Sequence, residues 1–147
     1  MRFIMKPLNN ISRSQAVFRN SKINIEGIGA AHHAFILKIC RNPGSTQEEI
    51  SQELCLDKST VARVLAHLEK YGYVKRIPNE KDKRELLVYP TESLMEVLPK
   101  IREVSKEWNL NITEGINEEE ITVFCAVLAK IEQNAKNIVE ELRGASK

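Results

Sequence analysis

The order of the elements predicted in the middle of the chain constrains the fold more than any other feature. Ser45 and Glu48 have the spacing of a capping box, which predicts a short helix over residues 45–54. After a short connection, Asp57 can cap a second helix over residues 58–71. Two short helices joined by so tight a connection are typical of a helix-turn-helix.

The second helix has a clear apolar face and is followed at once by two predicted strands. Gly72 can end this helix, and residues 73–77 and 84–89 then alternate as two strands joined by residues 78–83. The positions predicted to face the core are Val61, Val64, Leu65 and Leu68. A helix-turn-helix followed directly by a hairpin predicts a winged helix, which binds DNA with its second helix in the major groove.

Two further helices are predicted before this core. The first is expected over residues 8–19, and the second over residues 30–41, where Ala34, Leu37 and Ile39 would face the core. The first helix has only a thin apolar stripe and a basic opposite face. Alone it would be marginally stable, so we expect it to pack on a distant part of the chain or on another chain.

A long helix is predicted directly after the hairpin. It should begin at Thr91 or Ser93 and run toward Asn111. Pro99 should kink this helix unless a first turn begins there.

A capping pair, Asn117 and Glu120, opens the last predicted helix. Its apolar stripe consists of Ile121, Phe124, Cys125, Leu128, Ile131, Ala135, Ile138 and Leu142. A small core cannot cover so long a stripe, so we predict a homodimer that pairs helices within residues 1–22 and 92–143 of two copies.

Together these elements predict a single, mainly α-helical domain over residues 1–147. A winged helix-turn-helix core with a two-stranded wing occupies residues 30–91, and the N- and C-terminal dimerisation helices flank it.

Charge is unevenly distributed, although the formal net charge is only +2. Residues 1–22 carry five basic side chains and no acidic one, and residues 70–84 carry six basic and two acidic side chains. Residues 111–142 carry seven glutamates against two lysines. Two basic segments and one acidic segment indicate a polyanionic partner that meets part of the surface.

The composition disfavours several other classes of protein. No apolar run is long enough to span a membrane, and the first eight residues are too short for a signal peptide. Three scattered cysteines without CxxC spacing favour a reducing cytoplasm. We see no nucleophile–base pair, carboxylate dyad, glycine-rich phosphate loop or metal-ligand spacing, so we predict neither an enzyme nor a bound cofactor.

The predicted wing ends in a cluster of charge that a plain turn would not need. Asp82 and Arg84 are two residues apart, so the carboxylate can hold the guanidinium outward for a narrow, negative groove. The exposed, solubilising turn is the alternative for a lone hairpin, and the preceding helix-turn-helix makes DNA contact the favoured interpretation.

The helix-turn-helix supplies the other candidate DNA contacts. Arg63 can make two hydrogen bonds to guanine, and the hydroxyls of Ser59 and Thr60 suit phosphate or base edges. Ser45 and Thr46 place backbone N–H groups where a phosphate can sit. The full set of residues predicted to contact DNA is Ser45, Thr46, Lys58, Ser59, Thr60, Arg63, His67, Arg76, Lys81, Asp82, Lys83 and Arg84.

Residues 45–91 resemble the winged-helix core of the MarR family of bacterial transcription regulators. The similar segments are LDKSTVAR (residues 56–63), LEKYGYVKR (68–76) and DKR (82–84), where the family carries Asp-x-Arg in its wing. The resemblance implies a homodimer that binds a pseudo-palindromic operator, usually as a repressor released by a small ligand or by oxidation. The family usually has threonine at the position of Ala62, which affects the expected sequence preference.

The sequence leaves open which signal the protein senses and whether its partner is DNA or another protein. Adjacent helical residues face different ways, so His32 and His33 favour packing or pocket lining over metal binding, with His33 the candidate for a ligand pocket. Cys40 and Cys125 lie on apolar helical faces and are expected to be buried and inert. A redox-responsive regulator using Cys40 or Cys55, a metal-responsive one, and a winged helix that binds only protein are the alternatives.

Overall fold

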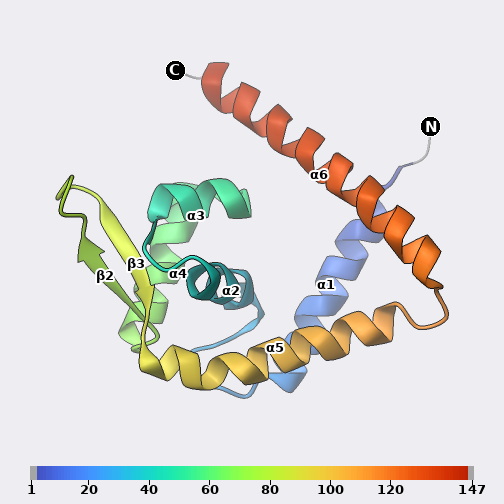
Figure 1. Ribbon diagram of the computed structural model, residues 1–147, viewed down its shortest axis with the longest axis horizontal. Helices are drawn as coiled ribbons and strands as arrows, with labels where there is room; N and C mark the ends of the chain where they lie inside the picture. The colour runs from blue at the N-terminus through green and yellow to red at the C-terminus, as the bar shows by residue number, and fades with distance from the viewer. Residues whose placement is uncertain (1–2, 146–147) are drawn as a thin grey trace. The chain divides into compact units, whose positions relative to one another are not determined.

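The computed structural model describes residues 3–145, so residues 1 and 2 of the predicted dimerisation segment and the last two residues lie outside the described part. The chain divides into two compact units, Met1–Trp108 and Asn109–Lys147. The elements of the first unit are α1 (Met5–Lys22), the 3-10 helix η1 (Ala30–His32), α2 (His33–Arg41), β1 (Ser45–Thr46), α3 (Gln47–Leu54), α4 (Lys58–Lys70), β2 (Val74–Pro78), β3 (Leu86–Pro90) and most of α5 (Glu92–Ile112) (Figure 1). The predicted winged helix-turn-helix is confirmed.

The cap of the first helix in the helix-turn-helix lies one residue later than predicted. Thr46, rather than Ser45, caps α3: its Oγ1 accepts from the Glu49 N–H (3.1 Å), and the Glu49 carboxylate accepts from the Thr46 N–H (2.8 Å). Ser45 pairs with Val88 in the sheet and is buried, and its hydroxyl donates to the Asn42 carbonyl (2.8 Å) rather than capping α3. Cys55 ends α3 with a φ of 54°, and this left-handed residue turns the chain toward α4.

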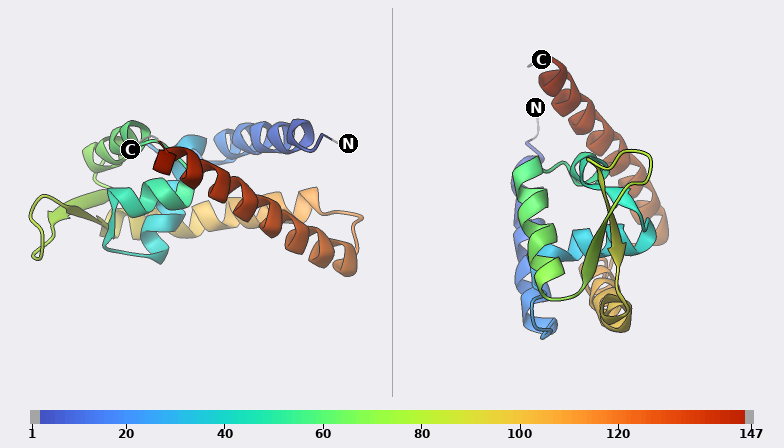
Figure 2. Two further views of the ribbon diagram at one scale, coloured as in Figure 1. Left: turned by 90° about the horizontal axis from the view of Figure 1, so that it is seen from above. Right: turned by 90° about the vertical axis from the view of Figure 1, so that its left-hand side faces the viewer.

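The sheet has three antiparallel strands in the order β1–β3–β2, one strand more than predicted. β2 and β3 form the wing (Figure 2). Their register runs from Val74 opposite Pro90 to Pro78 opposite Leu86. β1 has only two residues, too few to show an alternating pattern in the sequence. It joins the free edge of β3 and so fixes the base of the wing to the start of α3.

The core is formed mainly by α2, α4, β3 and α5. Residues with no exposed surface are Ile36, Ile39, Ile50, Val61, Leu65, Leu68, Val88, Leu94 and Ile101. All four positions predicted to face inward on α4 are buried. The prediction for α2 is only partly right, because its core face runs through Phe35, Ile36 and Ile39, which leaves Ala34 exposed and Leu37 half-buried.

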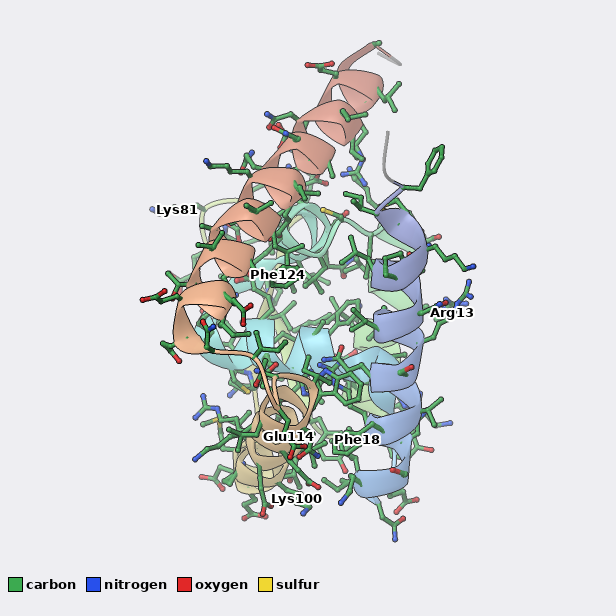
Figure 3. All side chains as sticks on the ribbon, turned by 90° about the vertical axis from the view of Figure 1, so that its right-hand side faces the viewer. Arg13, Phe18, Lys81, Lys100, Glu114 and Phe124 are labelled. Carbon is green, nitrogen blue, oxygen red and sulfur yellow. The ribbon has the colours of Figure 1, made fainter. Side chains whose placement is uncertain are left out.

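α1 is longer than predicted at both ends and packs on α5. Phe18 lies on the α5 side of α1, whereas Arg13 points outward (Figure 3). The ring centroids of Phe18 and Trp108 are 5.3 Å apart, and Lys22 Nζ lies 2.7 Å from the Glu107 carboxylate. These contacts join the two helices at the C-terminal end of α1.

α5 begins beside the predicted start and continues through Pro99. The Thr91 hydroxyl donates to the Gly72 carbonyl (2.6 Å) and accepts from the Leu94 N–H (3.4 Å), so it joins the end of α4 to the first turn of α5. Of the helices within residues 3–145, none combines the length and apolarity needed to cross a lipid bilayer.

The second unit contains the end of α5 and α6 (Glu118–Ala145). The predicted cap is confirmed: Asn117 Oδ1 accepts from the Glu120 N–H (2.9 Å), and the Glu120 carboxylate accepts from the Asn117 N–H (3.1 Å). Val123, Phe124 and Val127 line an apolar groove on α6. No residue of α6 is buried.

Candidate nucleic-acid interface

α4 begins at a carboxylate that collects hydrogen bonds from the first helical turn. Asp57 Oδ1 accepts from the Thr60 N–H (2.8 Å) and from the Ser59 hydroxyl (2.5 Å), and Oδ2 accepts from the Thr60 hydroxyl (2.7 Å). An N-cap aspartate reaches these positions because they follow it by two and three residues. The bonds, that of Ser59 first, hold the pKa of the exposed Asp57 carboxyl well below its usual range.

The two hydroxyls predicted to contact DNA are therefore both donors to Asp57. A hydroxyl has one hydrogen and two lone pairs, so Ser59 and Thr60 keep only acceptor capacity in this arrangement. Phosphate oxygens are acceptors too and cannot pair with them. The predicted phosphate contact conflicts with this geometry, whereas contact with donor groups on base edges does not.

Arg63 lies one turn further along α4 and is exposed. Within residues 3–145 its guanidinium has neither a hydrogen bond nor an ion pair, so all its N–H groups can bind a ligand. Lys58 differs, because its Nζ lies 2.7 Å from the Glu48 carboxylate of α3 while its side chain stays mostly exposed.

The predicted pair of Asp82 and Arg84 is present in the wing. Arg84 Nε lies 3.2 Å from Asp82 Oδ1, Nη2 lies 3.5 Å from Oδ2, and the Arg84 backbone N–H donates to Oδ1 (3.1 Å). The Arg84 side chain is still 92% exposed, so the carboxylate orients the guanidinium without burying it. The guanidinium in turn lowers the pKa of Asp82.

Hydrogen bonds within the wing hold its tip. The Asn79 backbone N–H donates to the Glu85 carbonyl (2.8 Å), and the Asn79 amide donates to the Glu85 carboxylate (2.7 Å). The Lys81 N–H donates to Asn79 Oδ1 (3.0 Å). Lys81 and Lys83, which were predicted to contact DNA, have exposed side chains.

The wing and the start of α3 border one cleft of about 380 Å³. Its lining residues are Thr46, Gln47, Glu48, Asp82, Arg84, Glu85 and Leu86. The structure thus brings Thr46 and the wing pair together, although they are far apart in the sequence. The Thr46 N–H was predicted to be available to a phosphate, but it donates to the Glu49 carboxylate instead.

Ser45 does not belong to this exposed surface. It is only 6% exposed, and its hydroxyl donates to the Asn42 carbonyl (2.8 Å). We therefore remove Ser45 from the predicted interface.

His67 also faces the protein rather than a groove. Its Nε2 lies 2.8 Å from the Gly27 carbonyl, and its ring stacks on His32 with centroids 4.5 Å apart. A carbonyl only accepts, so Nε2 carries the hydrogen. His67 ties α4 to the segment before α2, which conflicts with its predicted role in DNA contact.

Arg76 is likewise occupied by contacts within the protein. Its guanidinium lies 2.5 Å from the Glu69 carboxylate and 3.4 Å from Gln47 Oε1, and its side chain is 22% exposed. The pair raises the pKa of Arg76 and lowers that of Glu69. Arg76 therefore joins β2 to α3 and α4, and we remove it from the predicted interface as well.

His33 has a packing role in this structure. It is 2% exposed, and its Nε2 lies 2.6 Å from Ser105 Oγ. The Ser105 hydroxyl donates to the Ile101 carbonyl (3.1 Å), so the imidazole N–H donates to Ser105. Burial, with a smaller contribution from Arg19, lowers the pKa of His33 to about 4, and the ring is neutral at pH 7.

Metal and redox sensing gain no support from the described residues. Within residues 3–145, no group of three or more histidine, cysteine, aspartate or glutamate side chains is placed to hold a metal ion. Burial raises the pKa of the half-buried Cys40 thiol, which opposes its reactivity. Cys55 and Cys125 are exposed, so the expectation that Cys125 is buried is not met within its unit.

The role of Asp57 as a hydroxyl acceptor was not predicted, although the sequence carried a signal for it. Asp57 was identified as a cap, and the hydroxyl residues Ser59 and Thr60 follow it at the positions that an N-cap carboxylate reaches.

The chain is similar to known proteins along its whole length. The MarR family model matches residues 31–86. Two uncharacterised HTH-type transcriptional regulators of Bacillus subtilis align with this chain. YwhA is 31% identical over 100 residues, which cover 67% of this chain and 72% of YwhA. YybA is 24% identical over 147 residues, which cover 100% of this chain and 98% of YybA. A crystal structure assigned to the MarR family, from Listeria monocytogenes and complexed with 26mer DNA, is 26% identical, covers 93% of this chain and 91% of that chain, and has a TM-score of 0.88.

Proposed function

Because the chain belongs to the MarR family of transcription regulators, we propose that it binds duplex DNA through α4 and the wing. α4 is then the recognition helix, which enters the major groove with Arg63 and the first turn toward base edges. The wing follows the neighbouring backbone and minor groove. The pairing of Asp82 with Arg84 carries this proposal, because it holds an exposed guanidinium outward beside the start of α3.

A role in folding does not explain the pair. Ion pairs between exposed side chains contribute little to stability, and the Arg84 side chain is 92% exposed. A narrow minor groove, by contrast, concentrates negative potential and attracts arginine. Asp82 restricts the conformations of Arg84 before binding, which reduces the entropy lost on contact with DNA.

The proposal extends to a homodimer that represses transcription from a pseudo-palindromic operator. Among the described residues of α1 and α6 none is buried, and Val17 and Phe124 are more than half exposed. Apolar side chains on both helices support pairing of segments 1–22 and 92–143 with those of a second copy. In such a dimer the two recognition helices lie about 34–36 Å apart, to match one turn of DNA.

Two further parts of the proposal rest on the family resemblance. A small-molecule effector relieves repression by weakening DNA binding, and the protein acts in the cytoplasm together with its operator. We propose no catalytic activity for the chain.

Selection of bound sequences from a random duplex pool tests the proposed DNA binding. We expect an enriched inverted repeat with half-sites one helical turn apart. The logarithm of its affinity should fall with the logarithm of salt concentration by roughly 0.9 per phosphate contacted. No enrichment together with a flat salt response would exclude DNA binding and favour a winged helix that binds protein.

Sedimentation of the free protein at micromolar concentration tests the dimer separately. A stable monomer would remove the dimer and the inverted repeat from the proposal. Repeating the operator titration with candidate small molecules tests effector relief, for which the expected result is a lower affinity in the presence of one compound class.

A further inference from the structure

We infer that Asp57 determines which bases the recognition helix prefers, by fixing the hydrogen-bonding role of Ser59 and Thr60. The inference rests on the proposed DNA binding. Asp57 takes both hydroxyl hydrogens, so the two side chains meet the major groove as acceptors. Their partners are the exocyclic amino groups of adenine and cytosine, which are the donors in that groove.

The geometry gives each hydroxyl its own carboxylate oxygen. Ser59 donates to Oδ1 (2.5 Å), which also accepts from the Thr60 N–H, and the Thr60 hydroxyl donates to Oδ2 (2.7 Å). Hydrogen bonds to a carboxylate are roughly twice as strong as neutral ones. A hydroxyl that turned its hydrogen toward a base acceptor would exchange a stronger bond for a weaker one.

The surroundings leave the hydroxyls accessible and the carboxylate charged. Ser59 is exposed and Thr60 is half-exposed. Lys58 Nζ lies 2.7 Å from the Glu48 carboxylate, so this lysine pairs with Glu48 of α3. A negative charge at the start of α4 repels phosphates, which favours presentation of the first turn to base edges rather than to the backbone.

Asp57 also caps α4, and the test must separate the two roles. Aspartate, asparagine and serine are similarly good N-caps, so cap strength can be kept while the hydroxyl hydrogens are released. In Asp57→Asn, the remaining carbonyl oxygen still accepts from Ser59, whereas the amide donates to Thr60 and frees the Thr60 hydrogen. In Asp57→Ser, the single oxygen accepts from the Thr60 N–H and has one lone pair left, so at least one of the two hydroxyl hydrogens is freed.

The experiment selects bound sequences from one random duplex pool with the wild type and both variants, and then titrates the enriched duplexes. The wild type should prefer adenine or cytosine amino groups at the positions met by the first turn. Asp57→Asn should shift one position per half-site toward guanine or thymine, by roughly three- to tenfold in relative affinity. Asp57→Ser should likewise shift the preference toward guanine or thymine at one or both of the positions met by the two hydroxyls.

Thr60→Val provides the matched control, because it removes the hydroxyl and keeps the branched side chain. Adding Asp57→Asn to this variant should raise the affinity for all duplexes by removing a negative charge, without a further shift at the Thr60 position. A further shift there would mean that Asp57 does not act through Thr60 and would overturn the inference.

Other outcomes are equally decisive. Identical base preferences in the wild type, Asp57→Asn and Asp57→Ser overturn the inference, as does a wild-type preference for guanine or thymine at these positions. If Asp57→Ser fails to fold, which thermal unfolding detects, the Asp57→Asn comparison decides alone. Failure of the wild type to bind any duplex overturns the proposed function and, with it, this inference.

Discussion

Asp57 at the start of α4 and Asp82 in the wing each bind a side chain two residues further on, with opposite consequences. Asp57 accepts the single hydrogen of the Ser59 hydroxyl and leaves that side chain an acceptor. Asp82 accepts from two guanidinium nitrogens of Arg84 and leaves further N–H groups for another ligand. The same spacing therefore produces an acceptor in one region and an oriented donor in the other.

Both acceptors are carboxylates, so the different outcomes come from the side chains that they bind. A hydroxyl has one hydrogen to donate, whereas a guanidinium has five N–H groups. An acceptor suits a base edge with an amino group, and a cation suits phosphates and a narrow minor groove. Arg63 is a third case, since no carboxylate within residues 3–145 restrains its guanidinium. Comparing variants of Arg63 with variants of Arg84 therefore distinguishes direct contact with base edges from contact with the minor groove.

We expect Arg63→Ala to have the largest effect on operator binding. Loss of a paired contact to one base should weaken binding by about 1–3 kcal/mol and relax the preference at one position per half-site. Titration of the enriched operator and its single-base variants measures both effects. Arg63→Lys keeps the charge but not the paired contact, so a variant with wild-type preference would show that Arg63 contributes only charge.

Arg84→Ala should have a smaller and broader effect. We expect roughly tenfold weaker binding to all duplexes, with any lost preference confined to A·T-rich flanks. Lys81→Ala is the matched control, because Lys81 is an exposed cation of the same wing whose side chain is not oriented by Asp82. If Arg84→Ala and Lys81→Ala bind DNA equally well, the wing is only a solvated turn. Asp82 then does not orient Arg84 for DNA contact, and the contrast between Asp82 and Asp57 fails.

The two aspartates should differ in their effect on the fold. Asp57→Ala removes the cap of α4 and should lower the thermal unfolding temperature by several degrees, since N-caps contribute to helix stability. Asp82→Ala should leave the unfolding temperature nearly unchanged and weaken DNA binding less than Arg84→Ala does, because it frees the arginine without removing it. Equal melting temperatures for the two variants would show that Asp57 is not needed as a cap.

The sequence predicted the local part of both sites. Asp57 as a cap and Asp82 as a partner of Arg84 depend on residues two or three positions apart, whose relative placement a turn or helix start determines. The inward face of α4 followed in the same way from helical spacing. The order of helices and strands was therefore predictable without knowledge of distant contacts.

Several of the errors involve contacts between distant segments. Ser45 became part of a strand because it pairs with Val88, and His67 turned from the groove because it bonds to the Gly27 carbonyl, 40 residues earlier. Arg76 reaches Gln47 on another element. Helical and strand periodicity describe only a side chain's position on its own element, so they cannot predict these partners.

The smallest expected effect concerns pH, because both aspartates should stay ionised when the pH falls from 7 to 5. Hydrogen bonds, from the Ser59 hydroxyl first, lower the pKa of Asp57, and Arg84 lowers that of Asp82. A carboxyl with a lowered pKa in the folded state stabilises the fold above its ordinary value of about 3.9. That contribution is lost only as the pH falls through the lower, folded value, so base preference should not change at pH 5.

The fold itself should lose some stability over the same interval, for a reason that lies in the core. Burial lowers the pKa of His33 to about 4, whereas the unfolded chain binds the proton at about 6.5, so the free energy of unfolding decreases as the pH falls below about 6.5. Operator titrations at pH 7, 6 and 5, with circular dichroism on the same samples, distinguish the two effects. A changed base preference in protein that is still folded would mean that Asp57 gains a proton and releases a hydroxyl hydrogen. That result would contradict the expectation that Asp57 stays ionised at pH 5. Weaker binding with an unchanged preference and a partly lost helical signal would instead locate the pH sensitivity at His33, and His33→Leu should then remove it.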